Sequence, residues 1–443
     1  MKKVIAFICL FALSIASAIG CGANKTLLDP KKPVTLTMWH VYGEQAASPM
    51  DKFVEEFNST VGKKRGIVVD VTVKSNASQI GEKLLNAKNG VAGAPAMPDL
   101  FFCHASNAEE LGAENLIDWK EKFSGGELES FSANFLSDGM VGDRLSVLPV
   151  SKSTHLLFFA GEVFDIFARE NNVTYDDLKT WDGFLTVAQK YYDYSGGKPF
   201  CAFDYIIRSV ELDAMSRGAT DFYSDKGWYK DNDVLLSSYK KFANAIAKGH
   251  IIVSDKYSNT QVMTGQTIAG ISSSAAVLYY NDKITYEDNT WKFLNLKVLP
   301  IPQSEVGEKY ATQAGVGLCA SISTAQKAEA ATVFAKWFTE ENRNLDFVAK
   351  TGYMPVKNGA FEKLDNYVFK TEAYKNTYLA IKDTKNTCVF VSEPSIKGYY
   401  EKTYALYDGI RNLQNNILNE YAQGKTEQDV TQNLVNLFLN VGK

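Results

Sequence analysis

The hydroxyl-rich stretch 151–154, Ser-Lys-Ser-Thr, has residue types that could hold a polar ligand. Apolar runs at 148–150 and 156–159 flank it, and each predicts a buried strand. Polar residues at the centre of a buried run are costly unless they meet water or a ligand. We therefore interpret the stretch as a crossing between two lobes. A hairpin turn between two core strands is the alternative.

Further clusters of hydroxyl and amide side chains follow other apolar runs. They are the serines at 272–274 and the group Ser75, Asn76 and Ser78. Hydroxyls, amides and free backbone N–H groups suit a neutral polyol or an anionic oxygen. One such cluster is typical of a turn. Several of them at strand ends in two lobes predict a ligand-binding cleft.

Aromatic residues make up 12% of the chain. Their faces suit the apolar face of a sugar ring or a quaternary ammonium group. Most of them are expected to pack in the core. The exceptions stand in polar or glycine-rich loops, which makes them candidate ligand contacts: Tyr42, Tyr353, Tyr399 and Tyr400.

Composition and motifs exclude several functions. The four histidines are far apart and none has the spacing of a metal site, so we expect no metal and no cofactor. We find no nucleophile, zinc-protease or P-loop motif. A net charge of −4 provides no basic surface for nucleic acid. Carboxylates are plentiful, so a secreted glycosidase or phosphodiesterase that uses Asp or Glu side chains stays as an alternative function. A surface adhesin is a further alternative.

The N-terminus predicts export. Lys2 and Lys3 precede an apolar run at 4–19, which indicates a signal peptide over 1–20. The sequence Ala-Ile-Gly-Cys at 18–21 resembles a bacterial lipobox, which implies lipidation of Cys21. We therefore expect anchoring to a bacterial membrane, on the periplasmic side or at the cell surface, through a tether over 21–32. The remaining cysteines are expected to be buried apolar side chains, and one disulfide bond among them stays as an alternative: Cys103, Cys201, Cys319 and Cys388.

Periodicity predicts an α/β fold. Strands at 34–38, 67–73 and 98–103 alternate with helices at 50–57 and 80–91, as in a mostly parallel sheet. Ligands bind beyond the carboxyl ends of such strands. Later patterns predict a helix from Thr180, a strand at 296–302 returning to the first lobe, a strand at 315–322, a helix at 328–338, a long helix at 406–421 ended by Gly424, and a last helix capped by Thr426 and Asp429.

Several stretches together resemble the extracellular solute-binding proteins of ATP-binding-cassette importers, in the large carbohydrate-binding family. The glycerol-3-phosphate-binding branch is the most similar, and the resemblance covers nearly all of the mature chain. The stretches are Trp39-His40, the crossing at 149–159, Thr180-Trp181, 265–274, 315–318, and 334–356 with its Thr-Gly-Tyr-Met-Pro-Val at 351–356.

The resemblance implies a periplasmic-binding-protein fold, type II-like, with two α/β lobes joined by hinge strands. We expect the first lobe at 33–149 and 299–345, the second lobe at 150–298, and C-terminal helices at 346–443 that contribute to the second lobe and the hinge. The resemblance also implies ligand contacts at Ser153, Ser273, Ser274, Gly315 and Tyr353. Residue chemistry adds further candidates: Trp39, Tyr42, Asn76, Thr154 and Tyr400.

Departures from the branch concern the ligand. The branch has a tyrosine in the loop that is 76–78 here, and a glutamate after the third strand, where this chain has Ala-Ser at 105–106. Its Arg-Gly-x-Arg motif, which supplies the phosphate-binding arginine, reads Lys-Gly-Tyr-Tyr at 397–400. An arginine replaced by tyrosine removes a bidentate phosphate partner, for which Lys397 can substitute in part. A neutral sugar, an oligosaccharide or a glycerophosphodiester whose head group meets the added aromatics therefore fits at least as well as glycerol 3-phosphate.

The expected function is a lipid-anchored receptor. It captures a carbohydrate-like solute between two lobes and delivers it to the transmembrane subunits of an importer. We expect a monomer without enzymatic activity.

Overall fold

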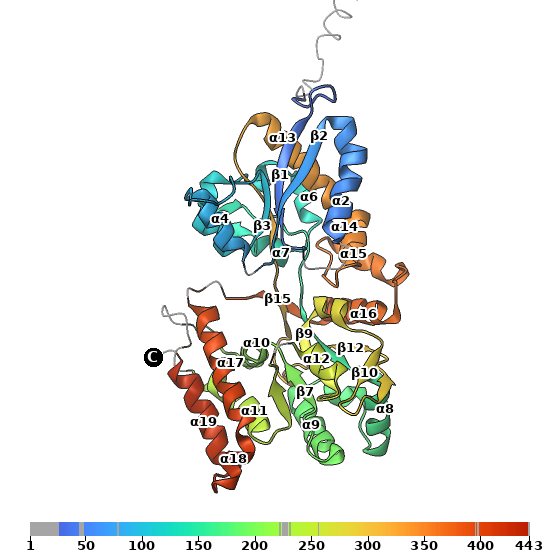
Figure 1. Cartoon of the computed structure of the whole chain (residues 1–443), viewed down its shortest axis with the longest axis vertical. Helices are drawn as coiled ribbons and strands as arrows, with labels where there is room; N and C mark the ends of the chain where they lie inside the picture. The colour runs from blue at the N-terminus through green and yellow to red at the C-terminus, as the bar shows by residue number, and fades with distance from the viewer. Residues whose placement is uncertain are drawn as a thin grey trace, which may run out of the picture.

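The computed structural model describes residues 26–43, 48–77, 79–220, 223, 229, 232–255, 257–394, 396 and 398–441. The expected signal peptide, Cys21, Ser78 and Lys397 lie outside these ranges. Figure 1 shows two lobes stacked along the long axis, with a few chain passages between them. The described part of the chain contains no helix long and apolar enough to cross a membrane.

The first lobe is built on a four-stranded sheet in the order β14-β3-β1-β2. Its strands are β1 (Val34–His40), β2 (Ile67–Lys74), β3 (Leu100–Cys103) and β14 (Gly317–Ala320). Both β2 and β3 run parallel to β1, whereas β14 is antiparallel to β3. The predicted parallel arrangement of the first three strands is confirmed, and the alternation in 67–73 places Ile67 and Val69 in the core.

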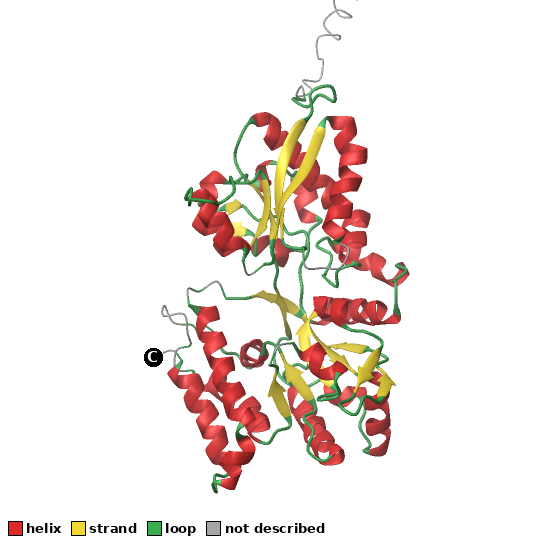
Figure 2. Ribbon diagram, in the orientation of Figure 1, coloured by secondary structure: helices red, strands yellow, loops and turns green. Residues whose placement is uncertain are grey.

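Helices cover both faces of this sheet (Figure 2). The helices of this lobe, including those at its end near the junction, are α2 (Pro49–Phe57), α3 (Lys63–Arg65), α4 (Ile80–Lys88), α5 (Ala105–Leu111), α6 (Gly125–Glu129), α7 (Ala133–Ser137), α13 (Ala325–Phe338), α14 (Glu341–Val348) and α15 (Asn358–Glu362). Ser48 caps α2 by accepting from the N–H of Asp51, and Pro49 occupies its first turn. The hairpin β4 (Met140–Val141) and β5 (Arg144–Leu145) precedes the crossing.

The second lobe is built on a five-stranded sheet in the order β12-β6-β9-β7-β8. Its strands are β6 (His155–Phe159), β7 (Cys201–Phe203), β8 (Ile251–Val253), β9 (Ala269–Ser273) and β12 (Lys297–Pro300). The hairpin β10 (Lys283–Thr285) and β11 (Trp291–Phe293) is separate from it. Because β12 pairs with β6, the prediction that 296–302 returns to the first lobe is wrong.

Helices surround the second sheet as well. They are α8 (Gly161–Glu170), α9 (Trp181–Ser195), α10 (Ile206–Ser216), α11 (Asp233–Ala247), α12 (Ser258–Met263), α16 (Glu372–Thr387), α17 (Tyr399–Asn415), α18 (Ile417–Ala422) and α19 (Glu427–Asn440). The predicted start of α9 is confirmed, since Thr180 accepts from the N–H of Gly183. So is the capping box of Thr426 and Asp429. The single helix predicted at 406–421 is instead divided at Asn416 into α17 and α18.

Two parallel hinge strands, β13 (Tyr310–Gln313) and β15 (Val389–Ser392), lie between the lobes. The crossing 148–154 forms isolated antiparallel bridges, Leu148 with Leu318, Lys152 with Met354 and Ser153 with Ala314. The strand predicted at 148–150 is therefore wrong, because this segment makes single bridges, whereas the strand predicted at 156–159 is confirmed as part of β6.

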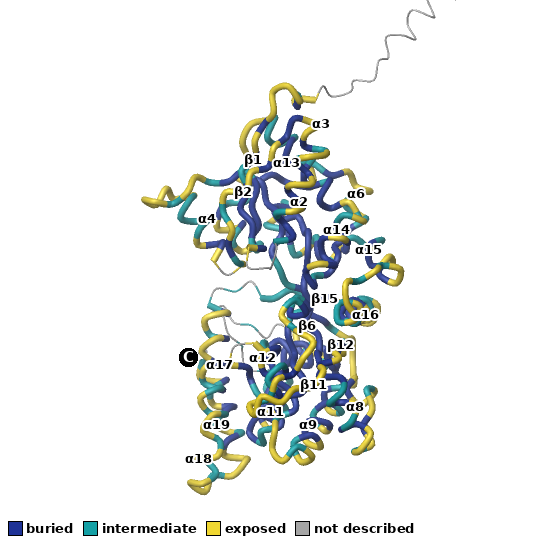
Figure 3. Tube along the Cα trace, turned by 45° about the vertical axis from the view of Figure 1, so that its right-hand side comes forward, coloured by how far each residue is buried: buried dark blue, intermediate teal, exposed yellow. Residues whose placement is uncertain are grey.

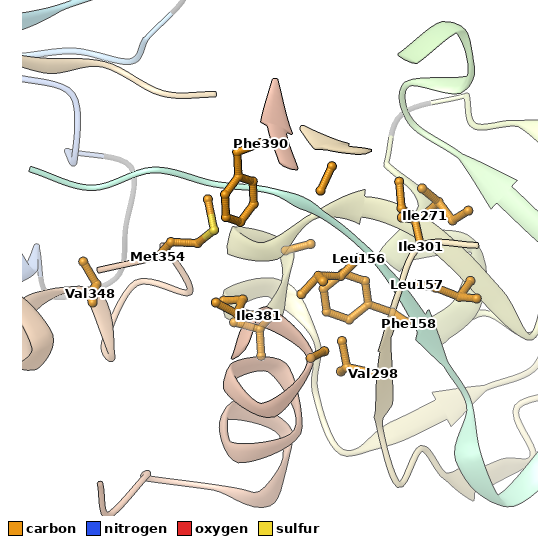
Figure 4. Packing of buried hydrophobic residues seen from close by; sticks show 14 of the residues in the cluster. Leu156, Leu157, Phe158, Ile271, Val298, Ile301, Val348, Met354, Ile381 and Phe390 are labelled. Carbon is orange, nitrogen blue, oxygen red and sulfur yellow. The ribbon is translucent and has the colours of Figure 1, made fainter. Parts of the chain in front are cut away.

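Apolar packing continues from one lobe to the other. A single cluster of buried side chains includes Phe57 of the first lobe and Phe438 of the second. Figure 4 shows Met354 and Phe390 beside the crossing, between Val348 and Leu156. The passages between the lobes are mostly buried or half-buried in Figure 3. The junction is thus a packed structural element on which a site can be held firmly.

Candidate functional site

The crossing 151–154 lies at the centre of the junction and is held by backbone hydrogen bonds. The N–H of Ser153 donates to the carbonyl of Ala314 at 2.9 Å, and the N–H of Ala314 donates back at 3.1 Å. At the next residue, the N–H of Ser274 donates to the carbonyl of Thr154 at 2.7 Å. These bonds join the crossing to the segment after β13 and to the end of β9. Three sequence-predicted contacts, Ser153, Thr154 and Ser274, are thereby brought together.

At the first-lobe end of the crossing, polar side chains satisfy one another. The buried ammonium group of Lys152 forms an ion pair with Asp138 and donates to the carbonyl of Gly315 at 3.2 Å. The hydroxyl of Ser151 lies 2.9 Å from that of Tyr42. The polar side chains at 151–152 are thus explained by partners within the protein itself, in addition to the ligand that the sequence suggested.

Tyr42 and Tyr353, each predicted as a candidate ligand contact from its loop, lie next to each other at this end. Their ring centroids are 6.2 Å apart in an edge-to-face arrangement, and Tyr42 also contacts Phe102 and Phe347. Burial raises the pKa of Tyr42, and burial raises the pKa of Tyr353 to about 12, so both phenols are neutral. Tyr42 is only 1% exposed, whereas Tyr353 is half-buried and can offer more surface to a solute.

At the second-lobe end, buried hydroxyls are left without partners. Among the described residues, neither Oγ1 of Thr154 nor Oγ of Ser274 makes a hydrogen bond, although both residues are at most 1% exposed. Ser273 differs, because its hydroxyl accepts from the N–H of Ala275 at 3.3 Å. A buried hydroxyl without a partner costs about 1–3 kcal/mol, which a hydrogen-bonding solute or water would relieve.

Gly315 presents bare backbone to the crossing. Its φ of +126° lies in a region that favours glycine, and an added Cβ would stand 3.4 Å from the carbonyl of Ser151. Its carbonyl is already used by Lys152. The space at Gly315 would therefore admit a Cβ, and its backbone conformation is what favours glycine there.

His155 follows the crossing and was not predicted as a site residue. It stacks on Tyr205 with ring centroids 5.2 Å apart, and its Nδ1 makes no hydrogen bond among the described residues. Burial, together with the nearby charge of Arg208, lowers the pKa of His155 to about 3. The imidazole is neutral at physiological pH.

The adjacent tyrosines at the start of α17 point to different environments. Tyr399 is 2% exposed, and its hydroxyl donates to Glu211 at 2.8 Å. Tyr400 is 48% exposed, and its hydroxyl donates to Glu393 at 2.7 Å. Only Tyr400 of the pair can present its ring to a solute.

Two predicted contacts have other roles. Trp39 is 1% exposed and shares a buried apolar cluster with Ile80 and Leu84, which is a core role; its role as a ligand contact stays a prediction. It lies within β1 and not in the loop after it. The side chain of Asn76 accepts from the N–H of Gln79 at 3.0 Å, next to the start of α4.

Sequence reasoning missed Glu393 and His104 as members of the junction. Burial and the charge of Lys152 lower the pKa of His104, whereas the charges of Glu393 and Asp138 raise it. His104 directly follows β3, and the position after a strand was the signal that could have identified it. Glu393 directly follows β15, which the sequence pattern did not reveal.

Two surface depressions lie away from the junction. One of about 320 Å³ is lined partly by Trp181, Arg217 and Lys241, and one of about 530 Å³ partly by Met97 and Leu116. Neither includes a predicted contact. Within the described ranges, no group of three or more His, Cys, Asp or Glu side chains could hold a metal ion.

Comparisons with known proteins agree with this architecture. The cyclic α-maltosyl-1,6-maltose binding protein of Arthrobacter globiformis is 15% identical in sequence to this chain. The structural alignment covers 93% of this chain and 99% of the Arthrobacter protein, with a TM-score of 0.67. The sugar-binding protein MalE of Xanthomonas citri is 15% identical, with coverages of 92% and 97% and a TM-score of 0.66.

A third solved structure is UgpB of Mycobacterium tuberculosis in complex with glycerophosphocholine. It is 14% identical, with coverages of 92% and 97% and a TM-score of 0.61. No curated protein matches the sequence of this chain. At such low identities, these structures establish the two-lobed α/β fold of solute-binding proteins, as predicted.

The family assignment comes from the sequence itself. The pattern of the family described as bacterial extracellular solute-binding protein matches residues 52–376, which is more than half of the 443 residues. The match includes three of the four strands of the first sheet, all five strands of the second and the crossing between them. This chain therefore belongs to the family of bacterial extracellular solute-binding proteins.

Proposed function

We propose that this protein is the solute-capturing subunit of an ATP-binding-cassette importer and that its ligand is rich in hydroxyl groups. The observation that carries the proposal is the pair of buried, unpartnered hydroxyls of Thr154 and Ser274 at the junction of the lobes. A polyol or sugar could satisfy them, and closure of the lobes around it would exclude water.

The proposed contacts surround the crossing. Thr154 and Ser274 supply hydroxyls, and half-buried Tyr353 supplies an aromatic face. Ser153, Ser273 and the backbone of Gly315 complete this part of the site, with Tyr42 behind Tyr353 and Tyr400 at the start of α17.

Candidate solutes are sugars, oligosaccharides and glycerophosphodiesters, in keeping with the cyclic maltosyl-maltose and glycerophosphocholine named for two of the structural neighbours. Glycerol 3-phosphate is less well supported. The arginine near Tyr399 and Tyr400 is Arg208, which is 3% exposed and paired with Glu211. A phosphate would have to compete with that carboxylate for the guanidinium group.

A thermal-shift panel tests the proposal. Maltose, longer maltodextrins, glycerol 3-phosphate and glycerophosphodiesters are added to purified protein, and a ligand bound by the native state raises the melting temperature. Tyr353→Ala should then weaken calorimetric binding about tenfold, because a stacked aromatic face is lost. Thermal stability of the ligand-free protein should change little. Unchanged affinity would remove Tyr353 from the site.

The rival activity is hydrolysis by a secreted glycosidase or phosphodiesterase. It gains no support from a family described by solute binding. Release of product from a panel member during prolonged incubation with the protein would favour the rival. Recovery of the intact solute from the complex would favour capture for import.

We further propose lipid anchoring at Cys21 and a monomeric receptor. The support for anchoring is the Ala-Ile-Gly-Cys sequence at 18–21. In the native host, Cys21→Ala should move the protein from the membrane fraction to the soluble exported fraction. Mass spectrometry of the wild-type N-terminus should find a diacylglyceryl group. An unmodified Cys21 in membrane-associated protein would contradict this proposal.

A further inference from the structure

Exposed aromatic rings gather around one carboxylate on the second lobe. Tyr400 and Tyr404 stand four residues apart on α17 and so share one face of the helix. Tyr257 directly precedes α12. These three rings are 48%, 57% and 64% exposed in that order, which is unusual for large aromatics. We call the following residues the tyrosine–glutamate patch: Tyr205, Tyr257, Glu393, Tyr400 and Tyr404.

Hydrogen bonding and electrostatics show that these residues are neighbours. The hydroxyl of Tyr400 donates to the carboxylate of Glu393 at 2.7 Å. Burial raises the pKa of Tyr404, and the nearby Glu393 and Tyr257 raise it further. Burial likewise raises the pKa of Tyr205, and the charges of Asp204 and then Glu393, with Tyr404 and Tyr257, raise it further. Glu393 therefore lies near Tyr205, Tyr400 and Tyr404, and Tyr257 lies near Tyr404 and Tyr205.

The patch faces the first lobe. Figure 1 shows that α17 begins at the end of the second lobe nearest the first. Glu393 is also close enough to His104, at the end of β3 in the first lobe, to raise the pKa of that histidine against the effect of burial. Tyr205 in turn stacks on His155, which directly follows the crossing. A solute held at the crossing would thus have the patch beside it.

Local charges favour a cation there. The guanidinium group of Arg208 is paired with Glu211 and also donates to the carbonyl of Ser392. The ammonium group of Lys152 is paired with Asp138. Both cations are already matched by a carboxylate. Burial lowers the pKa of Arg208, and the charges of Glu211 and Glu393 are among those that raise it, so Glu393 also lies near this guanidinium group. Two carboxylates thus face one guanidinium group, and the hydrogen-bond partner of Glu393 in the described part of the chain is a neutral phenol.

We propose that the tyrosine–glutamate patch is a subsite for a positively charged nitrogen carried by the solute. Aromatic faces attract quaternary ammonium and protonated amine groups, and a nearby carboxylate strengthens the attraction. The inference rests on the proposed function and names its substrate class, a hydroxyl-rich solute that also carries a cationic nitrogen. The hydroxyl groups would bind at the crossing and the nitrogen at the patch.

Calorimetry with matched ligand pairs tests the subsite. Glycerophosphocholine is compared with glycerophosphoglycerol, and the glucosamine dimer of chitosan with cellobiose. Each pair differs mainly in the cationic nitrogen. We expect the cationic member of at least one pair to bind about tenfold more tightly. Equal affinities within every pair that binds would overturn the subsite and leave the proposed function standing. A complete absence of binding by these compounds and by the sugar panel would overturn both.

Variants locate the effect. Glu393→Gln and Tyr404→Ala should each weaken binding of the preferred cationic ligand roughly tenfold and leave its neutral counterpart within about twofold. Both residues are at least partly exposed, so the variants should fold, and their unliganded melting temperatures check this. An equal loss for both members of the pair, or no loss for either, would overturn the subsite.

The chain provides a matched control. Tyr194 donates to Glu170 at 2.9 Å on the second lobe, and Tyr194 is 46% exposed. This is the same kind of tyrosine–glutamate bond, but Glu170 and Tyr194 lie on α8 and α9. Glu170→Gln and Tyr194→Ala should leave the preference for the cationic ligand unchanged. A loss as large as that of Glu393→Gln would show that the effect is not specific to the patch, and would overturn the proposal.

Discussion

The two ends of the crossing 151–154 treat their polar side chains differently. At the first-lobe end, Lys152 is paired with Asp138, and Ser151 with Tyr42. At the second-lobe end, Thr154, His155 and Ser274 each have a buried polar atom without a hydrogen bond among the described residues. Ser151, Lys152, Thr154, His155 and Ser274 are all buried, whereas the carboxylate of Asp138 at the first end is 22% exposed. The difference lies in whether the protein itself supplies the partners.

This contrast suggests that the first-lobe end stabilises the fold and the second-lobe end binds the solute. Paired groups at the first end hold the chain in one conformation, because separating them would leave a charge or hydroxyl buried alone. Unpartnered groups at the second end cost stability in the free protein and offer hydrogen bonds to a solute. When a solute forms hydrogen bonds with these groups, the cost of leaving them unpartnered in the free protein is removed. That gain contributes to the binding affinity.

The largest expected effect comes from breaking the ion pair of the first end. Asp138→Ala leaves the buried ammonium group of Lys152 without its carboxylate, and should lower the free energy of unfolding by about 3–5 kcal/mol. Urea denaturation measures it. Asp176→Ala removes the exposed pair with Lys179, which solvent screens, and should change stability far less. Equal effects would show that the first end gains nothing from burial.

Acid should destabilise the second end through His155. Its pKa is about 3 in the folded protein and about 6.5 when unfolded, so the unfolded chain binds more protons between these values. Stability from this group is present above pH 6.5 and is lost as the pH falls, at roughly 1.4 kcal/mol per pH unit. Urea denaturation at pH 6.5 and pH 5 should show a loss roughly 2 kcal/mol smaller in His155→Phe than in the wild type. Parallel pH curves would contradict it.

A smaller loss should follow removal of the Ser151 hydroxyl. Ser151→Ala leaves the buried phenol of Tyr42 without this partner, and should lower the free energy of unfolding by about 1–2 kcal/mol. Solute affinity should change less than stability. If Tyr42→Phe in the same protein restored the lost stability, the hydrogen bond would be identified as the cause. A stable Ser151→Ala variant would show that this bond is not structural.

The smallest effect on stability is expected at the opposite end. Ser274→Ala removes a hydroxyl that has no partner, so the free protein should keep its stability or gain up to about 1 kcal/mol. Affinity for the best solute of the panel should fall about tenfold. Thermal melts with and without solute measure both quantities. If Ser274→Ala were destabilised and kept full affinity, the hydroxyl at the second end would serve stability and not solute binding.

Local patterns were sufficient for most of the elements. The period of two in 67–73 predicted β2, Thr180 predicted the start of α9, and Thr426 with Asp429 predicted the cap of α19. These features depend on residues within one or two turns of each other, which a sequence displays directly. The two-lobed fold followed from the order of such elements together with the family resemblance.

The candidate site was predictable only in part. Hydroxyl clusters at 151–154 and 272–274 were recognised, and the structure joins them through the bond between Ser274 and Thr154. The sequence could not show that Lys152 has an internal partner in Asp138, because that contact depends on how the first lobe folds back on the crossing. Nor could it show that Trp39 faces the core, since an aromatic residue at a strand end is compatible with either direction.

The sequence by itself determined which segments are apolar on one face, where helices are capped and where polar residues interrupt buried runs. Only the tertiary structure decided that β12 pairs with β6, that Tyr399 lies inside while Tyr400 lies outside, and that Glu393 stands among exposed tyrosines. The physical reason is the range of the interactions. Hydrophobic periodicity and capping act over a few residues, whereas strand pairing and charge compensation depend on partners brought together by the whole fold.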